Sequence, residues 1–192
     1  MIDRLPAFHR PGRLNAIIET PRGSRNKYSY LEETGGFRLG KELPAGAVFP
    51  FDFGFVPSTL ASDGDPLDVL VLLDGPTFPG CLVRSRLLGV IEARQTGRSG
   101  RSVRNPRLIA AARKSSQFRQ ARSLEDLPES LVDDVVHFFE SYNAATGKRF
   151  AVTGRRGVDR ARELIAEAER RRTRADRRAE RPGSKPGSGR RR

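Results

Sequence analysis

The feature that most constrains this chain is a cluster of acidic residues directly before a short apolar run. Asp63, Asp65 and Asp68 lie within six residues, and residues 69–72 are all apolar. Carboxylates this close repel one another, which raises their pKa values and costs folding stability. A divalent ion that prefers oxygen ligands, such as Mg²⁺, removes that cost. The sequence therefore offers a candidate metal site anchored on a buried strand.

Three interpretations of the cluster compete. The simplest is a polar turn before a strand, because Asp-Gly and Asp-Pro are ordinary turn dipeptides. The second is an EF-hand calcium loop, which is excluded because the sixth position from Asp63 is Asp68, where that loop needs glycine. The third is a catalytic metal site. In an extended chain Asp68 would face away from Asp63 and Asp65, so a common site requires the bend that Pro66 allows.

Many short β-rich segments precede two amphipathic helices along the chain. This order predicts an α+β domain with a closed or highly curved sheet. The first helix falls within residues 123–148, and the second runs from residue 157 to about residue 172. The predicted strands are residues 14–20, 27–31, 37–39, 48–56, 69–72, 82–83, 87–93, 103–112 and 150–153.

The C-terminal end of the chain carries most of its positive charge. Residues 170–192 hold 11 of the 36 Lys and Arg residues and 2 of the 23 Asp and Glu residues, so they carry +9 of the +13 formal charge. We therefore predict a folded domain at residues 1–169 and a basic, mostly disordered tail at residues 170–192. Such a tail is expected to bind polyanions weakly through counterion release, and its charge assigns no nucleic-acid function to the domain.

Two features bear on the compartment. The single cysteine, Cys81, excludes an intrachain disulfide and fits a reducing cytosol. No apolar stretch reaches membrane-spanning length, and the N-terminus lacks the apolar core of a signal peptide. We therefore expect a cytoplasmic protein without a membrane partner.

The acidic cluster also carries a family resemblance. Residues 63–69, Asp-Gly-Asp-Pro-Leu-Asp-Val, resemble the signature of the soluble inorganic pyrophosphatases of the first family, and the similarity runs from about Asn15 to about Glu169. The resemblance implies a five-stranded OB-like closed barrel flanked by two C-terminal helices. It implies an enzyme that hydrolyses inorganic diphosphate to two phosphates with a metal-activated water. The expected ion is Mg²⁺, with Mn²⁺ as the alternative, and the expected assembly is a homo-oligomer, a hexamer in bacterial relatives.

The resemblance implies a role for each residue that matches the family pattern. Asp65 is expected to be the base that helps deprotonate the attacking water, and Asp63, Asp65 and Asp68 to bind the metal. Glu19 ends the first predicted strand, two residues before Pro21, and is expected to act on a further ion through water. The groups expected to balance phosphate charge are Lys27, Lys41, Arg107 and Tyr142.

Several positions depart from the family pattern. Gln95 and Asn105 stand where the family carries two further metal-binding aspartates, so an oxygen ligand remains but its charge is lost. Arg107 keeps the positive charge of a family lysine. We expect fewer or more weakly bound ions and a slower or differently tuned enzyme. The other departures are Ser29 for Glu, Lys41 for Arg, Phe49 and Phe53 for Tyr, and Asn143 for Lys, with Lys148 one turn beyond.

These departures leave two other functions open. One is hydrolysis of another phosphoanhydride by an enzyme of the same fold. The other is a non-catalytic protein that binds phosphate or polyanions. Asp52 lies among aromatic residues, so it is either an additional acidic group near the site or the cap of a turn.

Overall fold

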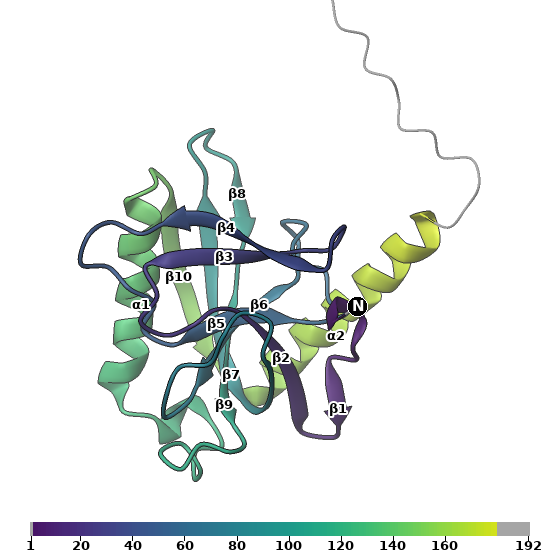
Figure 1. Ribbon diagram of the computed structural model, residues 1–192, viewed down its shortest axis with the longest axis horizontal. Helices are drawn as coiled ribbons and strands as arrows, with labels where there is room; N and C mark the ends of the chain where they lie inside the picture. The colour runs from purple at the N-terminus through teal and green to yellow at the C-terminus, as the bar shows by residue number, and fades with distance from the viewer. Residues whose placement is uncertain (1, 180–192) are drawn as a thin grey trace, which may run out of the picture.

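The core of the computed structural model, which describes residues 2–179, is a sheet that closes on itself (Figure 1). The strands of the ring follow the order β2-β5-β6-β9-β7, and β7 also pairs with β2. Four of these pairings are antiparallel, and β6 runs parallel to β9. The predicted five-stranded closed barrel is therefore confirmed. Its strands are β2 (Arg13–Thr20), β5 (Asp52–Val56), β6 (Leu67–Leu72), β7 (Leu82–Thr96) and β9 (Arg107–Ala112).

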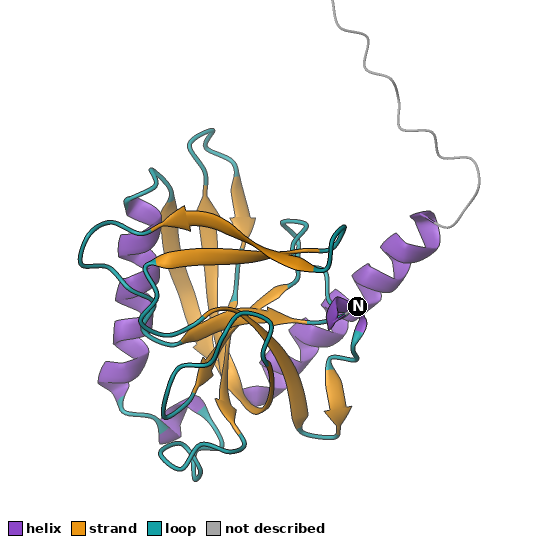
Figure 2. Cartoon of the chain, viewed as in Figure 1, coloured by secondary structure: helices purple, strands orange, loops and turns teal. Residues whose placement is uncertain are grey.

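The remaining elements surround this ring. One short strand extends it beside β2, two strands pair with β7, and a separate two-stranded hairpin, β3–β4, lies over one side of the barrel. The two helices lie on different sides of the sheet (Figure 2). These elements are β1 (Phe8–Arg10), β3 (Asn26–Leu31), β4 (Gly36–Glu42), β8 (Ser102–Arg104), β10 (Arg149–Arg156), α1 (Glu129–Ala144), α2 (Val158–Ala179) and the 3-10 turns η1 (Ile2–Arg4) and η2 (Leu124–Asp126).

Both faces of the central strands are buried. In β6, Val69 and Val71 join one apolar cluster with α2, whereas Leu70 and Leu72 join a second cluster with α1. The same alternation continues in the neighbouring strand β9. Because successive side chains of a strand point to opposite faces, an unbroken apolar run such as residues 69–72 suits a strand covered on both sides.

Strand β7 is a single strand of 15 residues where the sequence predicted two. Its pairing register shifts between Leu87 and Gly89, which marks a bulge. Gly89 has φ +157°, and a Cβ there would lie 2.5 Å from the carbonyl oxygen of Arg156 and 2.7 Å from Cγ of Leu124. Glycine therefore allows the close packing with which β7 bends and closes the ring.

The predicted strand at residues 103–112 is broken into β8 and β9. The break falls at Asn105 and Pro106, since proline lacks the N–H that continues a ladder. The break turns the chain, so that β8 extends the hairpin with β7 while β9 enters the barrel.

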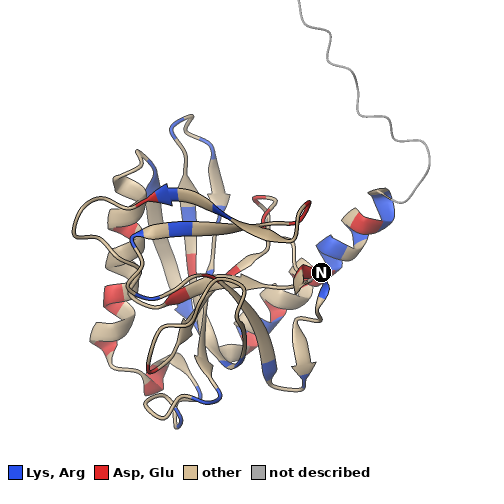
Figure 3. Cartoon of the chain, in the orientation of Figure 1, with Lys and Arg blue, Asp and Glu red and all other residues tan. Residues whose placement is uncertain are grey.

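Helix α2 extends to Ala179, seven residues past its predicted end, and its outer end projects from the barrel. Arg172 stabilises this part, because it pairs with Glu32 at 2.8 Å and with Asp176 at 3.0 Å. The expected disorder is therefore wrong for residues 173–179, and residues 180–192 of the predicted tail lie outside the described residues. Lys and Arg colour much of this outer end (Figure 3). No helix within residues 2–179 is long and apolar enough to cross a membrane.

Candidate active site

Two adjoining cavities collect the predicted site residues. The larger, which we call the front cavity, has a volume of about 460 Å³. The smaller, the side cavity, has about 320 Å³ and shares Lys27, Ser29, Asp65 and Asp68 with it. The predicted residues in the front cavity are Asp63, Asp65, Asp68, Lys27, Lys41, Arg107 and Tyr142, joined by Gln95, Asn105, Asn143 and Lys148. Glu19 lines the side cavity.

The acidic cluster bends as the position of Pro66 predicts. Asp63 and Asp65 lie on the loop before β6, Asp68 is the second residue of β6, and all three line the front cavity. The Asp63 carboxylate accepts a hydrogen bond from the backbone N–H of Asp65 at 3.3 Å. Burial raises the pKa of Asp63, and the charges of Asp68 and Asp65 raise it further. The charged cluster is therefore destabilised until a cation or proton joins it.

Asp68 is tied to Arg107, the first residue of β9. The Arg107 guanidinium donates to the carboxylate of Asp68 and to the amide oxygen of Asn105. Its carbon lies 4.8 Å from the ring centroid of Phe139 and 5.4 Å from that of Phe150, so aromatic packing fixes its position. Burial raises the pKa of Asp68, while the charges of Arg107 and Lys27 oppose that rise.

The two amides at the positions where aspartates were expected, Gln95 and Asn105, are hydrogen-bonded to each other. The side-chain nitrogen of Asn105 donates to the side-chain oxygen of Gln95 at 3.0 Å, and the oxygen of Asn105 accepts from Arg107. A continuous hydrogen-bonded chain therefore runs from Gln95 through Asn105 and Arg107 to Asp68. We call it the amide–arginine chain. The oxygen atom of each amide therefore already accepts one hydrogen bond.

Glu19 lies near the end of β2 and faces Asp65 and Asp68 across the side cavity. Its carboxylate accepts a hydrogen bond from the backbone N–H of Tyr30 at 2.7 Å. Burial raises the pKa of Glu19 to about 7, the Tyr30 hydrogen bond and Lys27 oppose this rise, and the charges of Asp68 and Asp65 add to it. A nearby cation would stabilise the charged form of a carboxyl group in this environment, as the predicted role of Glu19 requires.

Cationic groups face the acidic cluster from the β3–β4 hairpin. Lys27 and Lys41 are cross-strand partners, and Figure 3 shows basic segments on both strands of the hairpin. The Lys41 ammonium lies 4.0 Å from the ring centroid of Tyr142. Burial lowers the pKa of Lys41, and the charges of Lys27 and Lys148 lower it further. An anion such as phosphate, bound between these cations, would offset their mutual repulsion.

Tyr142 and its neighbours on α1 form the opposite wall. Burial raises the pKa of Tyr142 to about 12, so its hydroxyl stays protonated and is a hydrogen-bond donor at neutral pH. Asn143 is buried and donates to the carbonyl oxygen of Phe139 at 2.7 Å. Lys148 lines the same cavity as Asn143, so a positive charge is present on this wall.

Some placements differ from the sequence interpretation or were missed by it. Asp52 lines neither cavity, and its carboxylate accepts from the backbone N–H groups of Arg22 at 2.8 Å and Thr77 at 3.0 Å. It is therefore the cap of a turn. Phe49 and Phe53 line the front cavity and pack against each other at 5.5 Å. Other lining residues without a sequence signal are Gly40, Val103 and Thr146 in the front cavity, and Glu32 and Glu33 in the side cavity.

The donor set fits a hard divalent ion that keeps much of its water. Within residues 2–179 no group of three His, Cys, Asp or Glu side chains is close enough to hold a metal by itself. Asp63, Asp65 and Asp68 nevertheless share one cavity and offer only oxygen donors. Mg²⁺ characteristically binds through one or two carboxylates and several waters, so a loose cluster suits it better than a closed cage would.

Comparison with known proteins points to the same family by sequence and by structure. The sequence model of a family described as inorganic pyrophosphatase matches residues 16–173. The inorganic pyrophosphatase of Nostoc sp. is 36% identical over 164 residues, which cover 85% of this chain and 94% of that protein. That of Halalkalibacterium halodurans is 38% identical over 157 residues, covering 82% and 93%. The crystal structure of the inorganic pyrophosphatase of Thermus thermophilus is similar with a TM-score of 0.80 at 34% identity, covering 90% of this chain and 98% of that one.

Proposed function

The chain belongs to the inorganic pyrophosphatase family, and we propose that the front cavity is where it hydrolyses inorganic diphosphate. It is an acid-anhydride hydrolase that converts diphosphate and water to two phosphates. The observation that supports this site best is the convergence of Asp63, Asp65 and Asp68 with Lys27 and Lys41 in one cavity. Carboxylates for cations and ammonium groups for phosphate are the two requirements of phosphoryl transfer.

We propose Asp65 as the base that accepts the proton of the attacking water. It lines both the front and the side cavity, so it faces metal-binding and phosphate-binding groups alike. Its carboxylate makes no ion pair among the described residues, whereas Asp68 is engaged by Arg107. A free carboxylate can take up a proton without breaking another contact.

The ion in this proposal is Mg²⁺, with Mn²⁺ as the alternative. When bound, such an ion lowers the pKa of a coordinated water and neutralises phosphate charge. Asp63, Asp65 and Asp68 would hold it, and Glu19 would bind a further ion through water from the side cavity. Because the amide–arginine chain replaces two carboxylates with amides, the site is expected to hold fewer ions, or to hold them more weakly, than its relatives do.

The cations orient the substrate. Lys27 and Lys41 would hold one phosphate from the hairpin, while Arg107 and Tyr142 would hold the other from the barrel and α1. Since Tyr142 stays protonated, it donates a hydrogen bond to a phosphate oxygen without adding charge. Together these groups stabilise the charge that develops on the leaving phosphate.

The direct test is phosphate release from diphosphate with Mg²⁺, with Mn²⁺ and with chelator. We expect release that depends on the ion, and we expect Asp65→Asn to lower kcat by at least about 100-fold, the lower end of what general-base catalysis contributes. Asp52→Asn is the matched control, because Asp52 caps a turn outside both cavities. An Asp65→Asn variant as fast as the unmodified chain would refute Asp65 as the base.

A second candidate substrate is another phosphoanhydride. It is favoured by the amide–arginine chain, which changes the charge of one wall of the front cavity relative to the family. A screen of diphosphate, triphosphate and nucleoside triphosphates at equal Mg²⁺ concentration decides between them. The highest kcat/KM for diphosphate would exclude this candidate.

We also propose that the chain self-associates, as the expected homo-oligomer or hexamer requires. Two large apolar side chains beside one turn support this, since Phe78 is 65% exposed and Leu82 is 40% exposed. Phe78→Ser is expected to lower the mass measured by light scattering at a given protein concentration. Val48→Ser, at another exposed apolar position, is the control. The cytoplasmic location stays a prediction.

A further inference from the structure

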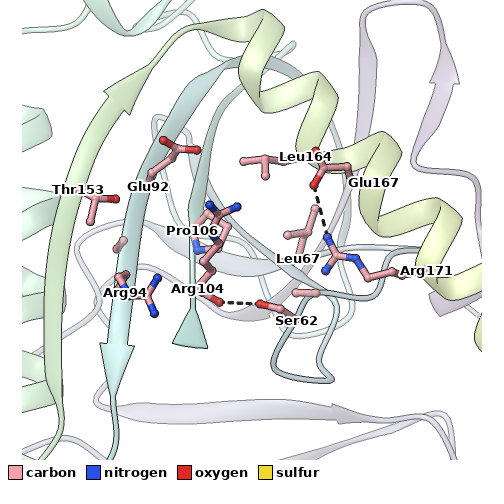
Figure 4. Close-up of a pocket in the computed structure, with 12 residues that line it drawn as sticks. Ser62, Leu67, Glu92, Arg94, Arg104, Pro106, Thr153, Leu164, Glu167 and Arg171 are labelled. Atoms are coloured by element: carbon pink, nitrogen blue, oxygen red, sulfur yellow. Dashed lines mark hydrogen bonds and ion pairs between the residues drawn. The ribbon is translucent and has the colours of Figure 1, made fainter. Parts of the chain in front are cut away.

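A third cavity lies on the other side of the wall that carries the site. We call it the back cavity, and its volume is about 540 Å³. It opens between β7, the Ser62 loop and α2, and residues from all three elements point into it (Figure 4). Its lining includes Glu92, Arg94, Arg104, Leu67, Leu164 and Glu167.

The front and back cavities share one wall, and neighbouring residues face opposite sides of it. Ser62 lines the back cavity and Asp63 the front one. The alternation of side chains along extended backbone explains this arrangement. The other back-and-front pairs are Leu67 and Asp68, Arg94 and Gln95, Arg104 and Asn105, and Pro106 and Arg107.

Two arginines of the back cavity lack a carboxylate partner. Arg104 makes no side-chain hydrogen bond or ion pair with any residue in the described part of the chain, and Arg94 bonds only to the hydroxyl of Ser102, at 3.1 Å. The two carboxylates that line the cavity are paired with other arginines. Glu92 pairs with Arg160 at 3.0 Å, and Glu167 pairs with Arg171 at 3.6 Å. The cavity therefore presents two uncompensated guanidinium groups, which match phosphate geometry.

Part of the remaining lining is apolar. Leu67, Leu164, Ala93 and Pro106 contribute to the wall beside the arginines. A concave site of this size, mostly apolar with a few convergent polar groups, is typical for a small organic ligand. Inorganic phosphate would leave this apolar surface uncovered, whereas a ring system attached to a phosphate would cover it.

We propose that the back cavity binds an organic phosphate monoester with a planar apolar body, of the class of the nucleoside monophosphates, and that its binding alters diphosphate hydrolysis. The phosphate lies between Arg94 and Arg104, and the ring system lies over Leu67 and Leu164. The hydroxyl of Ser62 donates to the carbonyl oxygen of Arg104 at 3.1 Å, which ties the acidic loop to β8. A ligand that moves Arg104 therefore acts on the backbone that carries Asp63 and Asn105. The effect on rate rests on the proposed function, whereas the binding does not.

Titration calorimetry of the full chain without metal or diphosphate tests the binding. The probes are adenosine 5′-monophosphate, adenosine and ribose 5-phosphate, which separate the contribution of the ring from that of the phosphate. Adenosine 5′-monophosphate is expected to bind at least about tenfold more tightly than either fragment, since adenosine lacks the charge-assisted contacts of the phosphate and ribose 5-phosphate lacks the apolar surface of the ring. Equal affinity for adenosine 5′-monophosphate and ribose 5-phosphate, or no binding at all, would overturn the proposal.

Paired variants locate the ligand. Arg94→Gln combined with Arg104→Gln is expected to weaken binding at least about tenfold. Arg101→Gln combined with Arg113→Gln makes the same change of charge at two exposed residues outside the cavity and should leave the affinity unchanged. Lys27→Gln combined with Lys41→Gln removes cations of the front cavity and should also leave it unchanged. Loss of binding in that last variant alone would place the nucleotide in the front cavity and overturn the proposal.

The effect on rate is measured separately. We expect saturating adenosine 5′-monophosphate to change kcat/KM for diphosphate in the unmodified chain and not in the Arg94→Gln, Arg104→Gln variant. An equal change in both would overturn the coupling. If the unmodified chain releases no phosphate from diphosphate, the proposed function fails, while the calorimetric result still decides whether the back cavity binds the nucleotide.

Discussion

Replacing Arg107 with methionine tests the ion pair on which the front cavity is built. Arg107 is 5% exposed and packs against Phe139 and Phe150, so methionine fills similar space without the charge. Removing one partner of a buried pair costs about 3–5 kcal/mol, because the other charge is left uncompensated. Burial already raises the pKa of Asp68, so uptake of a proton by Asp68 limits the cost of leaving it unpaired. We therefore expect Arg107→Met to lower the free energy of unfolding by about 3 kcal/mol. For a chain of this length that lowers Tm by roughly 6–12 °C.

The assay is urea unfolding at neutral pH with chelator present. Arg101→Met, at an exposed arginine, is the control and is expected to change stability by less than about 0.5 kcal/mol. In a double-mutant cycle, Asp68→Asn should lower the cost of Arg107→Met by at least about 1 kcal/mol, since no charge is then stranded. Added Mg²⁺ should restore part of the lost stability in Arg107→Met, because it replaces the missing cation. A loss below about 1 kcal/mol together with an additive cycle would refute the reasoning.

The remaining predictions concern the barrel, one surface carboxylate and the basic end. Gly89→Ala is expected to cost about 1–3 kcal/mol in urea unfolding because its Cβ would overlap backbone, whereas Gly75→Ala meets nothing within 4 Å. Hydrogen-bond donors from residues 115–117 hold the pKa of Asp74 well below its usual range. Asp74→Asn should therefore lower Tm at pH 7, and the difference in Tm should shrink below about pH 4. A difference in Tm that grows as the pH falls would contradict this. Deleting residues 180–192 should weaken binding to single-stranded RNA, as measured by filter retention across salt concentrations. Three exposed arginines of α2 are Arg170, Arg174 and Arg177. Neutralising all three should reduce the slope of log binding constant against log salt concentration by about 2. An unchanged slope would exclude them as phosphate contacts.

Local patterns were enough to predict most of the strands and helices, whereas the catalytic role of the acidic cluster came from the family resemblance and stays a prediction. The Asp-rich loop, the proline and the apolar run are adjacent in sequence, so the bend at Pro66 and the burial of β6 follow from short-range rules. The closed barrel came from the family resemblance rather than from any single pattern. It is confirmed by the pairing of β2 with both β5 and β7.

What the sequence could not give depends on contacts between distant segments. Whether Leu82–Thr96 forms one strand depends on Arg156 and Leu124, which pack against Gly89. The helix past residue 172 is held by Glu32, 140 residues away, through Arg172. The role of Asp52 as a cap depends on Thr77. None of these partners lies within a window that periodicity can inspect.

The amide–arginine chain gives a physical reason why amides at Gln95 and Asn105 are compatible with a metal-dependent site. The front cavity holds the three aspartates of the cluster against Lys27, Lys41, Lys148 and Arg107, and the side cavity adds Glu19, Glu32 and Glu33. Carboxylates in place of Gln95 and Asn105 would add two negative charges beside Asp68, and further cations would be needed to offset their repulsion. With amides there, Arg107 can neutralise Asp68 by itself. The expected consequence is a site that needs fewer ions to accept diphosphate, with Asp63 and Asp65 left as the carboxylates most available to them.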